Sequence, residues 1–452
     1  MWNISGLLTH VAADVVLDFS RLSFRSFRIW GMVAAIVYGL APHADACTIA
    51  VVSGRATSDG RPVLWKNRDF RTTKNEVVYF NDGQYACMGL VNAGMRQSIW
   101  MGLNEVGLCI QNSVSNDLGT SNSPEKDKKY QLGNGSFMLR ALKTCASAND
   151  VEELLKRTDQ AGRATKGNFA VIDAQGGAVL YEAGVHSHSK FDANDPDVAP
   201  LGFIVRSNFS MSGQKFLVPP TKEHLADLYS GERYLRAMDL VETGLKSHDL
   251  AQYLLKNCAR DLAINGEACA GSMNGLSGEL PEFVPTGKTI SRSTTVSFSV
   301  FQGVRPNEDP LLTTMWIGLG DPKFSVAIPC WVATTAISPD LQGKSGAPLC
   351  EAAIALRDRF YLQSRDGIRT TGLQAAWDHL LKEEDRTWHI VKSRLNVWRE
   401  NGIDRKSMQA VHLSAAEQAL AVLIHVTNSN QISQTQEVSE SVAPNADPFI
   451  EE

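Results

Sequence analysis

The chain has 452 residues, of which 43% are hydrophobic and 21% charged, and its formal net charge is −5 at pH 7. This length is sufficient to bury a large core, and the absence of any lysine and arginine block argues against a nucleic-acid partner. The eight cysteines form neither a dense disulfide framework nor a paired CxxC signature, so we expect no bound metal.

Residues 1–46 have the pattern of a secretory signal peptide. Arg21–Arg28 carries three arginines, residues 29–40 are apolar apart from two glycines, and Ala44-Asp45-Ala46 is a small-residue cleavage site. The apolar run is well short of the roughly 20 residues that a membrane-spanning helix needs. We therefore expect a periplasmic or secreted protein that contacts the membrane only transiently, through its signal peptide.

Cys47 would become the first residue of the mature protein after this cut. Its side chain is a thiol nucleophile, and its new α-amine, with a reference pKa of about 7.7–8.0, is partly uncharged near neutral pH and can accept a proton. Cleavage would therefore place nucleophile and base in a single residue.

A hairpin is predicted directly after Cys47. Residues 48–52 and 62–65 have strand patterns, and the intervening residues 54–60 favour a turn. Antiparallel pairing about this turn would bring Lys66, Arg68 and Asp69 back beside the cysteine. The sequence thus predicts a charged group of each sign near the nucleophile.

The segment 47–343 continues as strands, then helices, then strands, which predicts a layered α+β domain whose sheets are covered by helices. Alternation of apolar and polar residues predicts the strands, and apolar spacing between polar caps predicts the helices. The predicted strands are 97–101, 107–114, 168–172, 178–182, 201–207, 294–304, 313–319 and 325–331, and the predicted helices are 135–145, 150–156 and 222–241.

The segment 344–426 has long helical patterns, broadly over 347–362, 371–400 and 406–426. Such amphipathic stripes are typical of core packing or of a contact between the subunits of a homo-oligomer, and we find no catalytic cluster in them. The tail 427–452 is rich in serine, glutamine and glutamate, so we expect it to be disordered.

The remaining cysteines leave two readings open. Cys258 and Cys269 are close enough in sequence to form a disulfide, and so are Cys330 and Cys350. Buried free thiols are the alternative for each of them.

Six short motifs occur in an order that resembles the N-terminal-nucleophile hydrolases, and within that superfamily the linear-amide group of choloylglycine hydrolases, penicillin V acylases and acyl-CoA:6-aminopenicillanate acyltransferases. The resemblance covers residues 47–331 and implies a four-layer αββα sandwich with the nucleophile at the end of a central strand. The motifs are Cys47-Thr48-Ile49-Ala50, Trp65-Lys66-Asn67-Arg68-Asp69-Phe70, Gly102-Leu103-Asn104-Glu105-Val106-Gly107-Leu108, Gly167-Asn168-Phe169, Arg206-Ser207-Asn208-Phe209 and Gly231-Glu232-Arg233-Tyr234.

This resemblance implies roles for several residues near the nucleophile. Asp69 matches an aspartate that holds the terminal ammonium, Asn208 matches an oxyanion asparagine, and Arg233 matches an arginine that pairs with the aspartate or positions the nucleophile. Asn112 is the candidate for a second oxyanion donor. The ordinary alternatives are a hairpin ion pair for Asp69, a surface salt bridge for Arg233 and a strand-end asparagine for Asn112.

The cation beside the nucleophile has two candidates. Bile-salt hydrolases carry arginine before the motif asparagine, whereas this chain has Lys66 before Asn67 and Arg68 after it. Lys66 is at the matching position, and Arg68 is the better bidentate group. The difference leaves both residues open and argues against assuming a bile-salt substrate.

We expect an enzyme that cleaves the C–N bond of a linear, small-molecule amide through an acyl-enzyme on Cys47, without a metal or organic cofactor. Acyl transfer to an amine is the enzymatic alternative, because the same acyl-enzyme serves both outcomes. The alternative outside catalysis is an envelope or binding protein lipid-anchored at Cys47, although Ala44 and Asp45 are a poor context for lipoprotein cleavage.

Overall fold

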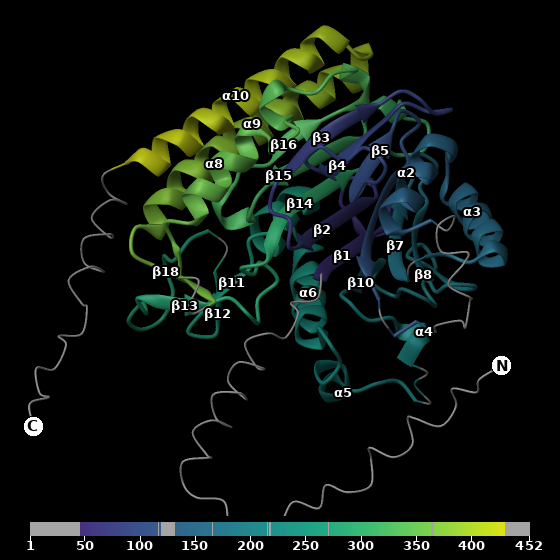
Figure 1. Cartoon of the computed structure of the whole chain (residues 1–452), viewed down its shortest axis with the longest axis horizontal. Coiled ribbons are helices and arrows are strands. Elements are labelled where there is room, and N and C mark those ends of the chain that lie inside the picture. The colour runs from purple at the N-terminus through teal and green to yellow at the C-terminus, as the bar shows by residue number, and fades with distance from the viewer. Residues whose placement is uncertain are drawn as a thin grey trace, which may run out of the picture. The chain divides into compact units, whose positions relative to one another are not determined.

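Two antiparallel sheets form the centre of the fold (Figure 1). Both contain only antiparallel neighbours. The first sheet has six strands in the order β10 (Phe203–Arg206), β1 (Ala46–Val52), β2 (Val63–Asp69), β14 (Thr295–Gln302), β15 (Thr314–Leu319) and β16 (Ile328–Cys330). The second has seven strands in chain order, β3 (Asn75–Phe80), β4 (Cys87–Asn92), β5 (Met101–Asn104), β6 (Cys109–Val114), β7 (Gly167–Ile172), β8 (Ala178–Ala183) and β9 (His188–Asp192).

The computed structural model describes most of the chain beyond the predicted cleavage point. The described residues are 46–115, 117–118, 132–164, 166–214, 216, 218–269, 271–362 and 366–429. The predicted signal peptide apart from Ala46, and the predicted tail beyond residue 429, lie outside them.

The two sheets pack face to face through alternate residues of their strands. Ile49 and Leu64 of the first sheet meet Leu90, Met101 and other apolar residues of the second in one buried cluster. Because successive side chains of a strand point to opposite faces, their neighbours in β1 and β2 point away from this interface. Residues at both sheet faces are therefore buried.

Helices cover the outer face of each sheet. The second sheet packs against α2 (Asn134–Thr144) and α3 (Ala148–Ala161), and the first packs against α6 (Gly231–Gly244), α7 (Leu250–Tyr253) and α9 (Leu373–Asn401). These layers follow the order helix, sheet, sheet, helix (Figure 1). The predicted α+β fold, a four-layer αββα sandwich, is confirmed.

The hairpin predicted at the start of this domain is present. β1 and β2 pair so that Cys47 lies opposite Arg68 and Val52 opposite Val63. A Cβ atom at Gly54, in the turn, would lie 2.4 Å from the carbonyl oxygen of Gly60, so the turn requires glycine there. Local sequence alone was sufficient to predict this part of the sheet.

Other predicted elements differ from those observed. The strand predicted at 97–101 overlaps β5 only at Met101, and β3 and β4 were not predicted. The helix predicted over 222–241 is two helices, α5 (Lys222–Ala226) and α6, because the chain turns at Ser230 with a φ of 66°. A Cβ atom on Gly231 would lie 1.7 Å from the carbonyl oxygen of Leu225, so only glycine fits this corner.

The C-terminal segment supplies three long helices, α8 (Pro348–Arg357), α9 and α10 (Arg405–Asn428). α9 contributes Trp377 to the cluster between the sheets and Trp388 to the outer cluster of the first sheet. The remaining elements are short: α4 (Met211–Gln214), the π-helical turn Leu254–Cys258, β11 (Leu262–Ile264), β12 (Glu267–Cys269), β13 (Phe283–Pro285), β17 (Tyr361–Leu362) and β18 (Gly367–Arg369).

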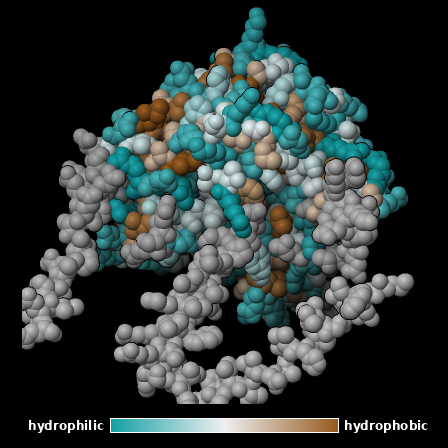
Figure 2. Space-filling model, in the orientation of Figure 1, coloured by the Kyte–Doolittle hydropathy of each residue, from teal (hydrophilic) through white to brown (hydrophobic). Residues whose placement is uncertain are grey.

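The outermost of these helices, α10, is long and apolar enough to cross a membrane by length and composition, with a mean hydropathy of 1.3 in its most apolar window. About a third of that window, 33%, is buried, and the helix packs against α8 and α9. Apolar residues also lie along the upper left of Figure 2, where α10 runs, and Ile424 is 49% exposed. The helix thus packs on α8 and α9 along one side and leaves apolar side chains such as Ile424 exposed on the other.

All eight cysteines lie in the described part of the chain and are free and buried. The disulfides considered between Cys258 and Cys269 and between Cys330 and Cys350 are therefore not formed. The alternative of buried thiols is the one observed.

Candidate active site

Cys47 lies at the start of β1, on the side of the strand that faces the second sheet. Ile49 and Val51, two and four residues further, belong to the cluster between the sheets, and strand alternation gives Cys47 the same direction. Its side chain is 8% exposed, and the preceding Ala46 is fully buried and paired with Asp69. The thiol is thus at the end of a central strand, as the family resemblance implied.

The backbone nitrogen of Cys47 donates a hydrogen bond of 2.9 Å to Oδ1 of Asn208. The backbone of Asn208 is fixed in turn, because its N–H donates to Oγ of Ser230. Its Nδ2 group donates to the carbonyl oxygen of Val114 at 2.9 Å. An amide has two such hydrogens, so one remains for an oxyanion.

Arg233, on α6, holds the nucleophile residue from the helix side. Its Nη1 donates to the carbonyl oxygen of Cys47 at 3.1 Å and to Oγ1 of Thr48 at 3.0 Å, and its Nη2 donates to Oδ1 of Asn208 at 2.9 Å. Burial and the nearby Arg292 lower the pKa of Arg233 to about 10. The group remains a cation at neutral pH and fixes three acceptors around Cys47.

Asp69 lies one layer behind this contact. Its carboxylate accepts hydrogen bonds from Nε of Arg292 at 3.0 Å and from Oγ1 of Thr295 at 2.7 Å, and it is 4.0 Å from Nη1 of Arg233. The acceptor for the Cys47 nitrogen is Asn208 rather than Asp69. In the uncleaved chain Asp69 is therefore linked to Cys47 through Arg233, and its contact with the terminal ammonium of the processed chain stays a prediction.

Lys66 lies on the same face of β2 as Arg68 and points toward the second sheet. Its Nζ donates to Oδ1 of Asn112 at 2.9 Å and to the carbonyl oxygen of Trp100 at 2.8 Å. Burial lowers the pKa of Lys66 to about 8, an effect that Cys47 opposes and Arg68 increases. The ammonium is therefore close enough to Cys47 for the two charges to interact.

Arg68 is held differently. Its Nη1 and Nη2 donate to Oδ1 of Asn75 at 2.9 Å and of Asn92 at 2.8 Å. Its guanidinium lies 4.2 Å from the ring centroid of Phe70 and 4.8 Å from that of Trp100. Amide oxygens and aromatic faces thus fix Arg68, while Lys66 interacts with the thiol and with Asn112.

The other seven cysteines are in apolar surroundings, and burial raises the pKa of each thiol: Cys87, Cys109, Cys145, Cys258, Cys269, Cys330 and Cys350. A thiol held protonated in this way is a poor nucleophile. Lys66, on the neighbouring strand β2, interacts electrostatically with Cys47.

A cavity of about 220 Å³ opens on the helix side of this cluster. Arg233 and Arg292 form part of its wall together with Lys288 and Glu232. Among the described residues, no group of three or more histidine, cysteine or acidic side chains is arranged to hold a metal ion.

Residues 55–211 match the model of a known family, acyl-coenzyme A:6-aminopenicillanic acid acyl-transferase. The resemblance to the N-terminal-nucleophile hydrolases is confirmed. The matched segment includes Lys66, Asp69, Asn112 and Asn208, and it begins after Cys47 and ends before Arg233.

Solved structures of this superfamily are also similar to the chain. An N-acylethanolamine-hydrolyzing acid amidase ortholog from Caenorhabditis elegans is 16% identical, with 58% of this chain and 93% of that one covered and a TM-score of 0.37. Penicillin V acylase from Agrobacterium tumefaciens is 14% identical (67% and 90% covered, TM-score 0.36). A variant of conjugated bile acid hydrolase from Clostridium perfringens is 12% identical (67% and 95% covered, TM-score 0.38). No curated protein sequence matches.

Several residues of the candidate site were not predicted. Arg292 and Thr295 hold Asp69 from more than 220 positions along the chain, and Ser230 holds Asn208. Pairing of β2 with β14 brings Thr295 opposite Asp69. A single sequence contains no signal for such contacts, because they depend on which strands become neighbours.

Proposed function

We propose that the chain is the precursor of an exported cysteine amidohydrolase that cleaves the C–N bond of a linear amide. The proposal rests on the two hydrogen bonds that fix the backbone of Cys47: its nitrogen donates to Asn208, and its carbonyl oxygen accepts from Arg233. Removal of residues 1–46 turns this nitrogen into an α-amine, for which Oδ1 of Asn208 provides an acceptor in the fold. The fold and the family match support chemistry on an acyl group.

The reaction begins with transfer of the thiol proton of Cys47 to its own α-amine. The thiolate adds to the amide carbonyl, and the tetrahedral intermediate collapses when the α-ammonium protonates the leaving amine. Water, deprotonated by the same amine, then adds to the thioester and releases the acid. The α-amine of Cys47 therefore relays both protons: it passes the thiol proton to the leaving amine, and it later passes a proton from water back to the departing thiolate.

Neighbouring groups support the charges that develop in these steps. The Lys66 ammonium, whose charge interacts with Cys47, supplies positive charge near the sulfur as it attacks the carbonyl. The remaining Nδ2 hydrogen of Asn208 and the amide N–H groups of Asn112 are the candidate oxyanion donors, and loss of one such donor typically lowers the rate by about 10²–10³-fold. Oδ1 of Asn112 already accepts from Lys66, which orients its amide.

Acyl transfer to an amine is the second candidate, because the matched family is named for an acyl-transferase. Hydrolysis and transfer share the acyl-enzyme and differ only in the second nucleophile. A lipid-anchored protein is disfavoured, because the Cys47 side chain is buried and points toward the second sheet.

The test uses the exported, processed protein with a panel of N-acyl amides. We expect N-terminal sequencing to begin at Cys47, intact mass to show an acyl adduct with a slow substrate, and product acid to appear. Added amine acceptors distinguish transfer from hydrolysis through the product formed. Cys47→Ala, which keeps the α-amine, is the matched control, and turnover retained in that variant would refute the mechanism.

A further inference from the structure

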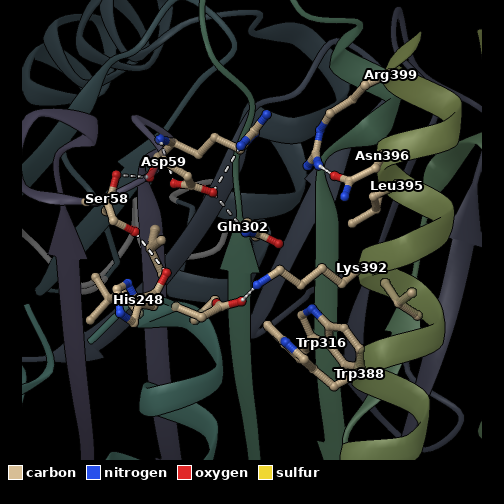
Figure 3. A pocket seen from close by; sticks show the side chains of 17 residues that line it. Ser58, Asp59, His248, Gln302, Trp316, Trp388, Lys392, Leu395, Asn396 and Arg399 are labelled. Atoms are coloured by element: carbon tan, nitrogen blue, oxygen red, sulfur yellow. Dashed lines mark hydrogen bonds and ion pairs between the residues drawn. The ribbon is translucent and has the colours of Figure 1, made fainter.

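A separate cavity of about 190 Å³ lies on the helix side of the first sheet, near the turn of the β1–β2 hairpin (Figure 3). One face of α9, the start of α7 and strands β2, β14 and β15 contribute its walls, and we call it the α9 cavity. Val63 lines it, and six residues of extended strand, about 20 Å, separate Val63 from Asp69. It is therefore distinct from the candidate active site.

The cavity is elongated along α9. The helix lines it with Trp388, Val391, Lys392, Leu395, Asn396 and Arg399, whose spacing of three and four residues places them on one face. At a rise of about 1.5 Å per residue, Trp388 and Arg399 are about 16 Å apart along the helix axis. Figure 3 shows Arg399 toward one end of the row and Trp388 toward the other, with Lys392 and Leu395 between them.

The first end carries two indoles with free donors. Trp316 and Trp388 stack with ring centroids 4.5 Å apart and are 1% and 3% exposed. Neither Nε1 has a hydrogen-bond acceptor among the residues that the structure describes. Buried indole N–H groups normally have one, and those of Trp65, Trp331 and Trp377 do. Both unpartnered indoles line the same cavity.

The second end is cationic. Arg61 is neutralised by Asp59, at 3.0 Å, and by Glu308, to which it also donates. Arg305 donates to Glu308 as well, whereas Arg399 lies 4.0 Å from that carboxylate. Nη1 of Arg399 donates to the neutral amide oxygen of Asn396 at 3.1 Å, and its buried Nε has no acceptor in the described part of the chain. Burial and the charge of Arg61 lower the pKa of Arg399. An anion beside Arg399 would compensate this excess positive charge.

The middle of the cavity is apolar and electrically balanced. Val63, Leu250, Val391 and Leu395 contribute apolar surface, and Lys392 is paired with Asp249 at 3.1 Å. The whole volume is many times the 10–15 Å³ that a single buried water requires. The cavity has hydrogen-bond donors without acceptors at both ends and apolar walls between them. It therefore fits an extended molecule with a polar group at each end and methylene groups in the middle.

We propose that the α9 cavity binds a straight-chain aliphatic dicarboxylate, with one carboxylate at Arg399 and the other at the N–H groups of Trp316 and Trp388. This gives the C-terminal helical segment a ligand-binding role in addition to packing. The proposal does not depend on the proposed catalytic function, because no residue of the Cys47 site lines this cavity.

Isothermal titration calorimetry of the full folded protein with dicarboxylates from glutarate to sebacate tests this binding. We expect saturable binding with an optimum at one chain length, and at least about tenfold weaker binding of hexanoate and octanoate, which lack the second carboxylate. Arg399→Gln is expected to weaken binding at least about tenfold, and Trp316→Phe or Trp388→Phe about fivefold, because each removes a donor while preserving shape.

Two matched variants on the same helix control for general effects. Arg394→Gln removes an exposed guanidinium outside the cavity, and Trp377→Phe removes an indole that already donates to Lys323. Both should bind like the wild type. The indole N–H signals of Trp316 and Trp388 in ¹⁵N spectra are identified by their absence from the Trp316→Phe and Trp388→Phe variants. In the wild type, these two signals should shift when the dicarboxylate binds.

Three results would overturn the proposal. The first is the absence of saturable binding across the dicarboxylate series, which would mean that solvent alone occupies the cavity. The second is equal affinity for monocarboxylates and dicarboxylates, which would exclude recognition at both ends. The third is binding that Arg399→Gln and both Trp→Phe variants leave unchanged, which would place the ligand elsewhere.

Discussion

Replacing Lys66 with methionine is expected to remove a rise in stability that the wild-type protein shows between about pH 8 and 10.5. The buried ammonium of folded Lys66 loses its proton near pH 8, whereas in the unfolded chain the proton stays until about 10.5. Between these values the unfolded state binds more protons, so the free energy of unfolding increases with pH. Above about pH 10.5 Lys66 is neutral in both states, so its buried charge no longer lowers the free energy of unfolding.

The size of the effect follows from the pKa difference. Each pH unit corresponds to about 1.4 kcal/mol, so lowering the pKa from 10.5 to about 8 amounts to about 3 kcal/mol. Methionine also leaves the acceptors on Asn112 and Trp100 without their donor, which lowers stability at every pH. The pH dependence, rather than the absolute stability, is therefore the relevant quantity.

Urea denaturation of wild type and Lys66→Met at a series of pH values measures this difference, and it requires no substrate. The free energy of unfolding of the wild type should increase relative to the variant by up to about 3 kcal/mol across the window. Lys288→Met, at a lysine whose side chain is 83% exposed, should follow the wild type. Parallel curves for wild type and Lys66→Met would show that Lys66 is not a buried cation of this kind.

Three further predictions concern the surroundings of the nucleophile. Iodoacetamide should alkylate Cys47 before the other cysteines, and Lys66→Met should slow that alkylation, as peptide mass mapping can measure. Arg233→Met should lower kcat of the processed enzyme about 10²-fold, because the residue holding the reacting groups is lost, while Arg233→Lys restores only part of it. Gly231→Ala should destabilise the fold by about 1–3 kcal/mol in urea denaturation, because its Cβ would meet the carbonyl oxygen of Leu225.

Each of these has an outcome that contradicts it. Uniform alkylation of several cysteines would mean that the Lys66 charge does not activate Cys47. Full activity in Arg233→Met would assign that arginine a structural role only. Gly133→Ala, whose Cβ would make only an ordinary contact of 3.9 Å with Oγ of Ser136, is the control for Gly231→Ala, and equal stability of the two would argue against the tight corner at α6.

The hairpin at Cys47 could be predicted because its information is local. Alternation over a few residues and a glycine-containing turn determine both the pairing of β1 with β2 and the arrival of Lys66 and Asp69. β3 was missed because its polar residues are buried: Glu76 is 1% exposed and is neutralised by Arg96 at 2.6 Å. A buried, paired charge interrupts the alternation of apolar and polar residues from which a strand is predicted.

The sequence predicted which residues belong to the candidate site better than it predicted how those residues contact one another. The residues expected near Cys47 include Asn208 and Arg233, which contact it directly. The indirect position of Asp69 depends on Arg292, which reaches it only after β14 pairs with β2. The row on α9 looks like an ordinary amphipathic stripe, and only the fold shows that Trp316 completes it from another strand.

The burial of Ala46 has a consequence for the order of events during biogenesis. Ala46 is fully buried and hydrogen-bonded into β1 opposite Asp69, so the Ala46–Cys47 bond lies within a completed sheet. A membrane-bound peptidase acts on an extended, accessible strand of substrate, which this bond can be only before β1 docks. Under the proposed export and cleavage after Ala46, processing must therefore precede the docking of β1, and a precursor that folded first could no longer be cleaved.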